Sequence, residues 1–198
     1  MKILFAEDQT MVRNALANLL RLQDDTQVIE AENGQMAIEQ LKAQAFDLVL
    51  TDIEMPEISG IELTQWVKQY QPQTPVVVIT TFNRSGYIQR VLDAGAKGFL
   101  LKDAPVEELL QALRSVLAGQ RVINNELLLQ ALGNRDPLSE KERKALKLAS
   151  DGLTTSKIAA TLFVAEDTAR NILSNAISKL HAENRIDAAR IAHQNGWL

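Results

Sequence analysis

The chain has 198 residues, of which 46% are hydrophobic and 23% charged, as expected of one or two globular domains. It contains no cysteine, which excludes disulfides, thiolate nucleophiles and cysteine-ligated zinc. No apolar run approaches the roughly 20 residues needed to span a bilayer and no leader pattern is present, so the sequence predicts a cytoplasmic protein without membrane insertion.

The first 118 residues alternate between strand and helix patterns. Short apolar, β-branched runs predict five strands, and the segments between them carry apolar residues at helical spacing. We expect strands at 3–6, 28–31, 48–51, 76–80 and 97–101, and helices at 10–22, 34–43, 61–70, 86–94 and 105–118. Pro105 fits the first turn of the last helix, where its missing N–H costs nothing. Repeated βα units predict an α/β fold, a doubly wound five-stranded parallel sheet.

Charged residues follow three of these strands directly. Glu7 and Asp8 end the first, Asp52 ends the third and Lys102 ends the fifth. The carboxyl ends of parallel strands meet at one edge of a sheet, so the three carboxylates would form an oxygen-rich site suited to Mg²⁺. The lysine would offset the charge of an incoming phosphoryl group. Each carboxylate alone fits a turn or helix cap equally well, but the four residues together favour a phosphate-accepting aspartate.

The remaining sequence contains only helical patterns after a linker at 119–137. The linker includes a possible short helix at 126–132. Helices are expected at 139–150, 156–162, 166–180 and 186–195. Ser139 and Glu142 form a capping-box pattern at the start of the first of these helices.

Charge is distributed unevenly between the two parts of the chain. The formal net charge is −4, but residues 137–198 carry nine basic and seven acidic residues, a net charge of +2. This excess hints at a nucleic-acid-binding half, although a solvated basic face would give the same count.

The motif residues in both halves have the spacing of known families. In the first half they are Glu7, Asp8, Asp52, Met55, Pro56, Gly60, Thr80, Phe99 and Lys102. These resemble the flavodoxin-like receiver domain of two-component response regulators, which would occupy 1–118. In the second half the matching stretches are 137–143, 152–154, 157–159, 168–171 and 179–185. These resemble the LuxR-type helix-turn-helix domain of the NarL/FixJ subfamily, which would occupy 138–198 as a small all-α domain.

Further similarity lies in three short segments, Thr80-Thr81-Phe82, Gly86-Tyr87 and Gly196-Trp197. Within the subfamily these are most similar to regulators of lipid desaturation and envelope stress in Gram-positive bacteria.

The receiver resemblance implies a role for each charged residue of the site. Asp52 would be the phosphoacceptor, which attacks the phosphohistidine of a sensor histidine kinase and forms an acyl phosphate. Glu7, Asp8 and Asp52, together with the backbone carbonyl of Glu54, would hold Mg²⁺.

Three further residues would respond to the phosphoryl group. Thr80 would hydrogen-bond its oxygens and Lys102 would pair with them. Phe99 would turn inward when Thr80 moves. Thr80 and Phe99 fit an ordinary strand and core equally well.

The second resemblance implies that the helix at 166–180 reads DNA. Such a helix lies in the major groove and presents its N-terminal half to the bases. The expected base contacts are Arg170, Asn171 and Ser174, and the expected phosphate contacts are Thr155, Lys157 and Lys179. Ala165 stands where the family usually has a capping serine or threonine, a loss worth about 1 kcal/mol. A solvated helix face remains the alternative for Arg170 and Lys179.

These observations favour a non-enzymatic transcription factor over two other functions. Phosphorylation of Asp52 would promote homodimerisation, through helices 86–94 and 105–118, and binding of double-stranded promoter DNA. A phosphatase or phosphotransferase is one alternative, although the Asp-x-Asp pair expected of aspartate-based phosphatases is absent. A phosphorylation-independent DNA-binding protein is the other.

Overall fold

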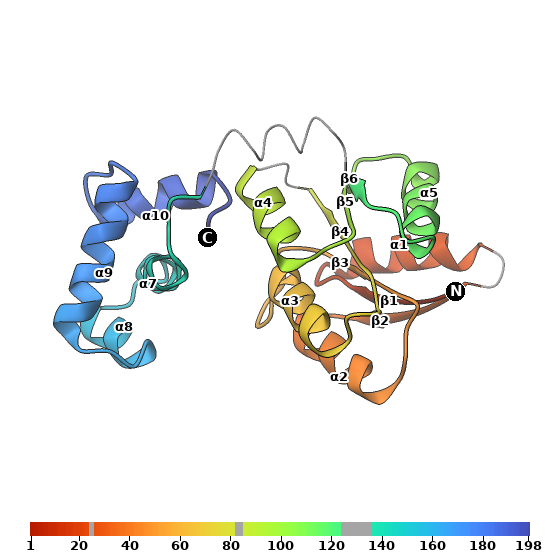
Figure 1. The fold of residues 1–198 in the computed structure, drawn as a ribbon, viewed down its shortest axis with the longest axis horizontal. Coiled ribbons are helices and arrows are strands. Elements are labelled where there is room, and N and C mark those ends of the chain that lie inside the picture. The colour runs from red at the N-terminus through yellow and green to blue at the C-terminus, as the bar shows by residue number, and fades with distance from the viewer. Residues whose placement is uncertain (24–25, 82–84, 124–135) are drawn as a thin grey trace. The chain divides into compact units, whose positions relative to one another are not determined.

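The chain folds into two compact units (Figure 1). The computed structural model describes residues 1–23, 26–81, 85–123 and 136–198. The short helix predicted at 126–132 lies outside these residues. Within them, no helix has the length and apolar character required to cross a membrane.

The first unit is built on a six-stranded sheet in the order β2-β1-β3-β4-β5-β6, in which every pairing is parallel. The strands are β1 (Lys2–Ala6), β2 (Gln27–Ala31), β3 (Leu48–Thr51), β4 (Val76–Thr80), β5 (Gly98–Leu101) and β6 (Val122–Ile123). The five strands predicted from the sequence are confirmed. The two-residue β6 is an addition, because it pairs with β5 inside the segment predicted to be linker.

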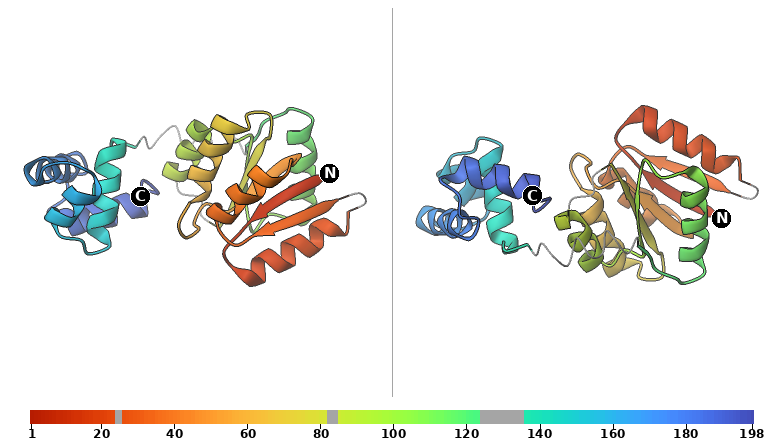
Figure 2. Two further views of the ribbon diagram at one scale, coloured as in Figure 1. Left: turned by 90° about the horizontal axis from the view of Figure 1, so that it is seen from below. Right: turned by 90° about the horizontal axis from the view of Figure 1, so that it is seen from above.

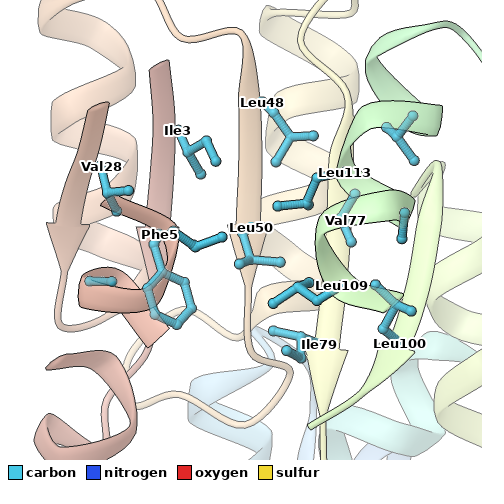
Figure 3. Close-up of a cluster of buried hydrophobic side chains, with 14 residues drawn as sticks. Ile3, Phe5, Val28, Leu48, Leu50, Val77, Ile79, Leu100, Leu109 and Leu113 are labelled. Atoms are coloured by element: carbon cyan, nitrogen blue, oxygen red, sulfur yellow. The ribbon is translucent and has the colours of Figure 1, made fainter. Parts of the chain in front are cut away.

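Helices cover both faces of this sheet (Figures 1 and 2). They are α1 (Thr10–Arg21), α2 (Gly34–Ala43), α3 (Gly60–Tyr70), α4 (Ser85–Ala94) and α5 (Val106–Leu117). Side chains from the strands pack against α1 and α5 in one apolar cluster, which includes Phe5, Leu50 and Leu113 (Figure 3). The doubly wound α/β fold is therefore confirmed. Pro105 is the N-cap of α5 and not part of its first turn, which corrects the predicted boundary by one residue.

The second unit contains α7 (Glu140–Ser150), α8 (Thr155–Thr161), α9 (Glu166–Lys179) and α10 (Arg185–Gln194). The capping box predicted at the start of the first of these helices is confirmed. Ser139 and Glu142 form the capping box of α7, and the Thr154 side chain accepts a hydrogen bond from the backbone N–H of Lys157. Ala165 precedes α9 without a side-chain cap, as expected. Two apolar clusters, one shared by α7, α8 and α9 and one by α7, α9 and α10, hold the four helices together.

Candidate functional site

Three carboxylates meet at the carboxyl edge of the sheet. Glu7 and Asp8 follow β1 and Asp52 follows β3, and these strands are neighbours with Ala6 opposite Thr51. One carboxylate oxygen of each acid lies within 4.8 Å of the others. Glu7 and Asp52 are buried and Asp8 is exposed, so the cluster opens to solvent on the Asp8 side.

Lys102 reaches this cluster from the end of β5. Its Nζ lies 2.6 Å from Glu7 Oε2 and 3.2 Å from Asp52 Oδ2, and only 7% of its side chain is exposed. The Lys102 backbone N–H donates to the carbonyl of Thr80 (2.8 Å), which ties the end of β5 to the end of β4. The strand-end residues singled out in the sequence therefore lie together in the structure.

The donor set fits a hard divalent cation. With all groups ionised, three negative charges face the single positive charge of Lys102. Glu7 Oε2 is buried and pairs with the ammonium by charge, but it accepts no hydrogen bond of normal geometry. Carboxylate oxygens with unused lone pairs and an excess of negative charge are what Mg²⁺ requires of a protein site.

Asp52 is held in place through its backbone. Its N–H donates to the carbonyl of Ala6 (2.9 Å), and its carbonyl accepts from the Thr51 hydroxyl (2.9 Å). Gly60, the first residue of α3, donates its N–H to the carbonyl of Ile53 (2.9 Å). A Cβ at Gly60 would lie 1.8 Å from the Asp52 carbonyl oxygen. Only glycine therefore lets α3 start this close to the aspartate.

Burial controls the acidity of Asp52. Removal of the carboxyl from water raises its pKa from 3.8 to about 6; Lys102 lowers it and the charge of Glu7 raises it. Burial dominates because a charge in a poorly solvated position loses its hydration. At neutral pH the carboxylate is still mostly ionised, as a nucleophile must be.

This raised pKa predicts a pH dependence of stability for the metal-free chain. Between pH 3.8 and about 6 the folded state binds more protons at Asp52 than the unfolded state, so the free energy of unfolding should fall as the pH rises through this window. Over the whole window, Asp52 lowers the free energy of unfolding by about 3 kcal/mol. Chemical denaturation in EDTA should show wild type losing stability relative to Asp52→Asn as the pH rises through this window. Parallel curves for the two proteins would contradict the assigned pKa.

The other predicted receiver residues lie on β4, on β5 and in the segment after β3. Thr80, the last residue of β4, is fully buried. Phe99 lies in β5 opposite Val78 and is also buried, so its ring occupies the inward position. Glu54 is exposed two residues after Asp52, as expected of a residue that would contribute only its backbone.

Arg13 was missed by the sequence reasoning. It lies on α1 with its side chain buried, and its Nη1 donates to the carbonyl of Glu7 at 2.7 Å. A signal was present, because Arg13 precedes Ala17 and Leu20 by four and seven residues, and these three are the buried residues of α1. A charged residue within the apolar stripe of a helix indicates a buried partner.

The predicted base contacts lie on the free side of α9. Arg170, Asn171 and Ser174 are all exposed, whereas Ala169 and Leu173 of the same helix are buried. Lys157 is also exposed, and Thr155 is half-buried at the start of α8. The polar face of α9 is therefore exposed, as insertion into the major groove of DNA would require.

Both cations of α9 are paired within the unit. Arg170 contacts Asp167 (2.8 Å) and Glu166 (3.4 Å), one turn earlier on the same helix. Lys179 contacts Glu142 (2.8 Å), which belongs to the capping box of α7. Lys179 therefore has a structural role, which competes with its predicted contact to phosphate.

Comparisons with known proteins identify a family for each half of the chain. The profile of the response regulator receiver domain matches residues 3–114, and that of bacterial regulatory proteins of the luxR family matches 136–192. Transcriptional regulatory protein DesR of Bacillus subtilis is 40% identical over 99% of this chain and 98% of its own length. The uncharacterized transcriptional regulatory protein YvfU of the same organism is 38% identical over 100% and 99%.

Solved structures show the same architecture. RcsB from Salmonella enterica serovar Typhimurium, bound to promoter rprA in the presence of the phosphomimetic BeF3−, has a TM-score of 0.74 at 27% identity. The similarity covers 96% of this chain and 97% of that one. The response regulator ChrA of a heme-sensing two-component system has a TM-score of 0.57 at 32% identity, over 100% and 98%.

Proposed function

Because the chain belongs to the response regulators that join a receiver domain to a LuxR-family DNA-binding domain, we propose that phosphorylation of Asp52 controls its activity. Membership of this family makes it a regulator of transcription and not an enzyme. The observation that carries the proposal is the position of the Lys102 ammonium between Glu7 and Asp52, beside the exposed Asp8.

The chemical step would be an in-line transfer to the Asp52 carboxylate. A carboxylate oxygen attacks the phosphorus of a phosphohistidine on a sensor kinase, the P–N bond breaks, and the histidine leaves with its electron pair. Glu7, Asp8, Asp52 and the carbonyl of Glu54 would hold Mg²⁺, which neutralises the charge of the approaching phosphoryl group. Lys102 would exchange one of its two carboxylate contacts for a phosphoryl oxygen and so offset part of the added negative charge.

The signal would leave the site through β4 and β5. The Thr80 hydroxyl would turn to the phosphoryl group, and the space it leaves would fix Phe99 in the buried position. Because both residues lie on neighbouring strands, the change would shift the equilibrium between two receiver conformations.

A phosphoryl-donor experiment tests this function. Wild type incubated with Mg²⁺ and acetyl phosphate should gain the mass of one phosphoryl group, and EDTA should prevent the gain. Continuous release of phosphate with many turnovers would favour the phosphatase alternative. Absence of any gain, with operator binding intact, would favour the phosphorylation-independent DNA-binding protein.

The output would be binding of double-stranded promoter DNA through α9. The RcsB structure was solved with a promoter, and the α8–α9 pair of this chain has the helix-turn-helix arrangement that places the second helix in the major groove. Arg170 suits guanine and Asn171 suits adenine.

Replacing Arg170 by alanine should reduce specific binding by about 1–3 kcal/mol and relax the preference at one base position in each half-site. The exposed pairs with Glu166 and Asp167 are worth little, so their loss should not hide the effect. Binding to operator and random duplexes would be measured by fluorescence anisotropy.

Lys157→Ala is the matched control for this prediction. Removing an exposed phosphate contact should weaken binding to all DNA sequences alike and reduce the salt dependence of the affinity. Lys157 is preferable to Lys179 here, because Lys179 is tied to Glu142. If Arg170→Ala weakens operator and random DNA equally, Arg170 contacts only phosphate.

A further inference from the structure

The guanidinium of Arg13 joins the loop after β1 to two acids of a neighbouring segment. Nη1 donates to the carbonyl of Glu7 (2.7 Å) and approaches that of Asp8 (3.4 Å). The other nitrogens reach acids in and after β2, with Nη2 at 3.3 Å from Glu32 and Nε at 3.6 Å from Glu30. The side chain is only 8% exposed, so these contacts replace most of its hydration.

We propose that Arg13 is a positioning residue, which sets the place of the Glu7 and Asp8 carboxylates for Mg²⁺; this rests on the proposed function. The described contacts of the Arg13 guanidinium are to backbone carbonyls and to Glu30 and Glu32, and none is to a carboxylate oxygen of Glu7, Asp8 or Asp52. Arg13 acts on the backbone carbonyls of the two residues whose side chains would bind the cation.

The contacts of Glu7 show why this backbone anchor matters. The Glu7 N–H donates to Ala31 (3.0 Å), and its Oε1 accepts from the N–H of Gln9 (3.2 Å). The carbonyl of Glu7 is the remaining backbone group, and Arg13 is its side-chain donor. Asp8 is exposed, so the position of its carboxylate depends on the loop that Arg13 holds.

The planar fork of arginine is needed for this task. Nη1 binds the carbonyl of Glu7 while Nη2 contacts the carboxylate of Glu32, and the planar guanidinium fixes the distance between these two contacts. A lysine at position 13 would keep the charge but is a single point donor, and it could not satisfy both sides at once. Arg13→Lys therefore loosens the loop without leaving Glu30 and Glu32 beside an uncharged side chain.

Arg21 offers a matched control on the same helix. Its Nη2 donates to the carbonyl of Val28 (2.9 Å) and to Glu30 (2.7 Å). It thus repeats the combination of a backbone carbonyl and an acid, and shares Glu30 with Arg13, but no contact of the described residues joins it to the loop of Glu7 and Asp8. Arg21→Lys therefore tests the loss of an arginine contact to Glu30 without disturbing that loop.

The experiment compares Mg²⁺ affinity in the full chain. Titrations followed by the amide NMR shifts of residues 8 and 52 should give a dissociation constant roughly 10-fold higher in Arg13→Lys than in wild type. Arg21→Lys should match wild type. With acetyl phosphate, Arg13→Lys should need correspondingly more Mg²⁺ for half-maximal phosphorylation and recover the wild-type rate at saturation, a separation that general instability would not produce.

Each outcome decides the proposal. Unchanged Mg²⁺ affinity in Arg13→Lys, or an equal loss in Arg21→Lys, overturns it. A wild type that shows no Mg²⁺-dependent shift overturns both the metal site and the role of Arg13. A wild type that binds Mg²⁺ but takes up no phosphate overturns only the proposed function, and weaker Mg²⁺ binding in Arg13→Lys then still supports Arg13.

Glu32→Gln serves if Arg13→Lys does not fold. It removes one anchor of the guanidinium from a side chain that is 66% exposed, so the fold is not at risk. A shift of Mg²⁺ affinity in the same direction supports the positioning role, and unchanged affinity overturns it.

Discussion

Asp52→Ala is expected to abolish uptake of phosphate from acetyl phosphate or from a phosphorylated kinase. In the proposed reaction the Asp52 carboxylate is the nucleophile, and Glu7 and Asp8 only hold the metal, so its removal leaves no acceptor for the phosphoryl group. Phosphate incorporation would be measured by mass spectrometry of the intact chain, with Mg²⁺ in excess.

Asp8→Ala is the control that separates the nucleophile from the metal. It keeps Asp52 and Lys102 but removes the exposed carboxylate, so phosphate uptake should survive with a higher Mg²⁺ requirement. Far-ultraviolet circular dichroism of both variants should match wild type. Uptake by Asp52→Ala at the wild-type rate would disprove the assignment of the phosphoacceptor.

Most of this site could be predicted from the sequence, because the signal for each residue is the strand directly before it. Glu7, Asp52 and Lys102 each follow a strand directly, and a parallel sheet brings such ends to one edge whatever the details of packing. The helices of the second unit were predictable for a similar reason, since Ser139 and Thr154 act on residues within one turn of themselves.

The features that escaped prediction depend on distant parts of the chain. The helical spacing places Arg13 in the buried stripe of α1, but only the structure shows that its acidic partners lie in and after β2. Lys179 meets Glu142 across 37 residues. β6 is two residues long, too short to show a strand periodicity, and exists only because β5 offers it an edge.

Phosphorylation is expected to shift the chain from monomer towards dimer and to raise operator affinity by roughly 10²–10⁴-fold. A single copy should bind DNA weakly, since α9 carries two acids against two cations and lacks a side-chain cap at Ala165. Two linked copies make the second contact effectively intramolecular, which raises the affinity without any new contact to the bases.

We expect exposed apolar side chains of the receiver to take part in this association. The sequence favoured the helices now seen as α4 and α5, and the structure adds α1, which packs with α5 against the same face of the sheet. Met11 is 84% exposed and Leu22 is 76% exposed, at opposite ends of α1. Leu22→Asp should weaken dimerisation while leaving phosphate uptake intact, because Leu22 lies at the C-terminal end of α1, whereas Glu7 and Asp8 precede the first residue of this helix.

Light scattering with Mg²⁺ and beryllofluoride, a mimic of the phosphoryl group, should show the mass of wild type roughly doubling. Asp52→Ala should stay monomeric under the same conditions, since the mimic needs the same carboxylate. Operator affinity, measured on the same samples, should rise only where the mass rises. If affinity rises while the mass stays that of a monomer, dimerisation is not the switch, and phosphorylation must act by releasing a DNA-binding domain that the rest of the chain holds back.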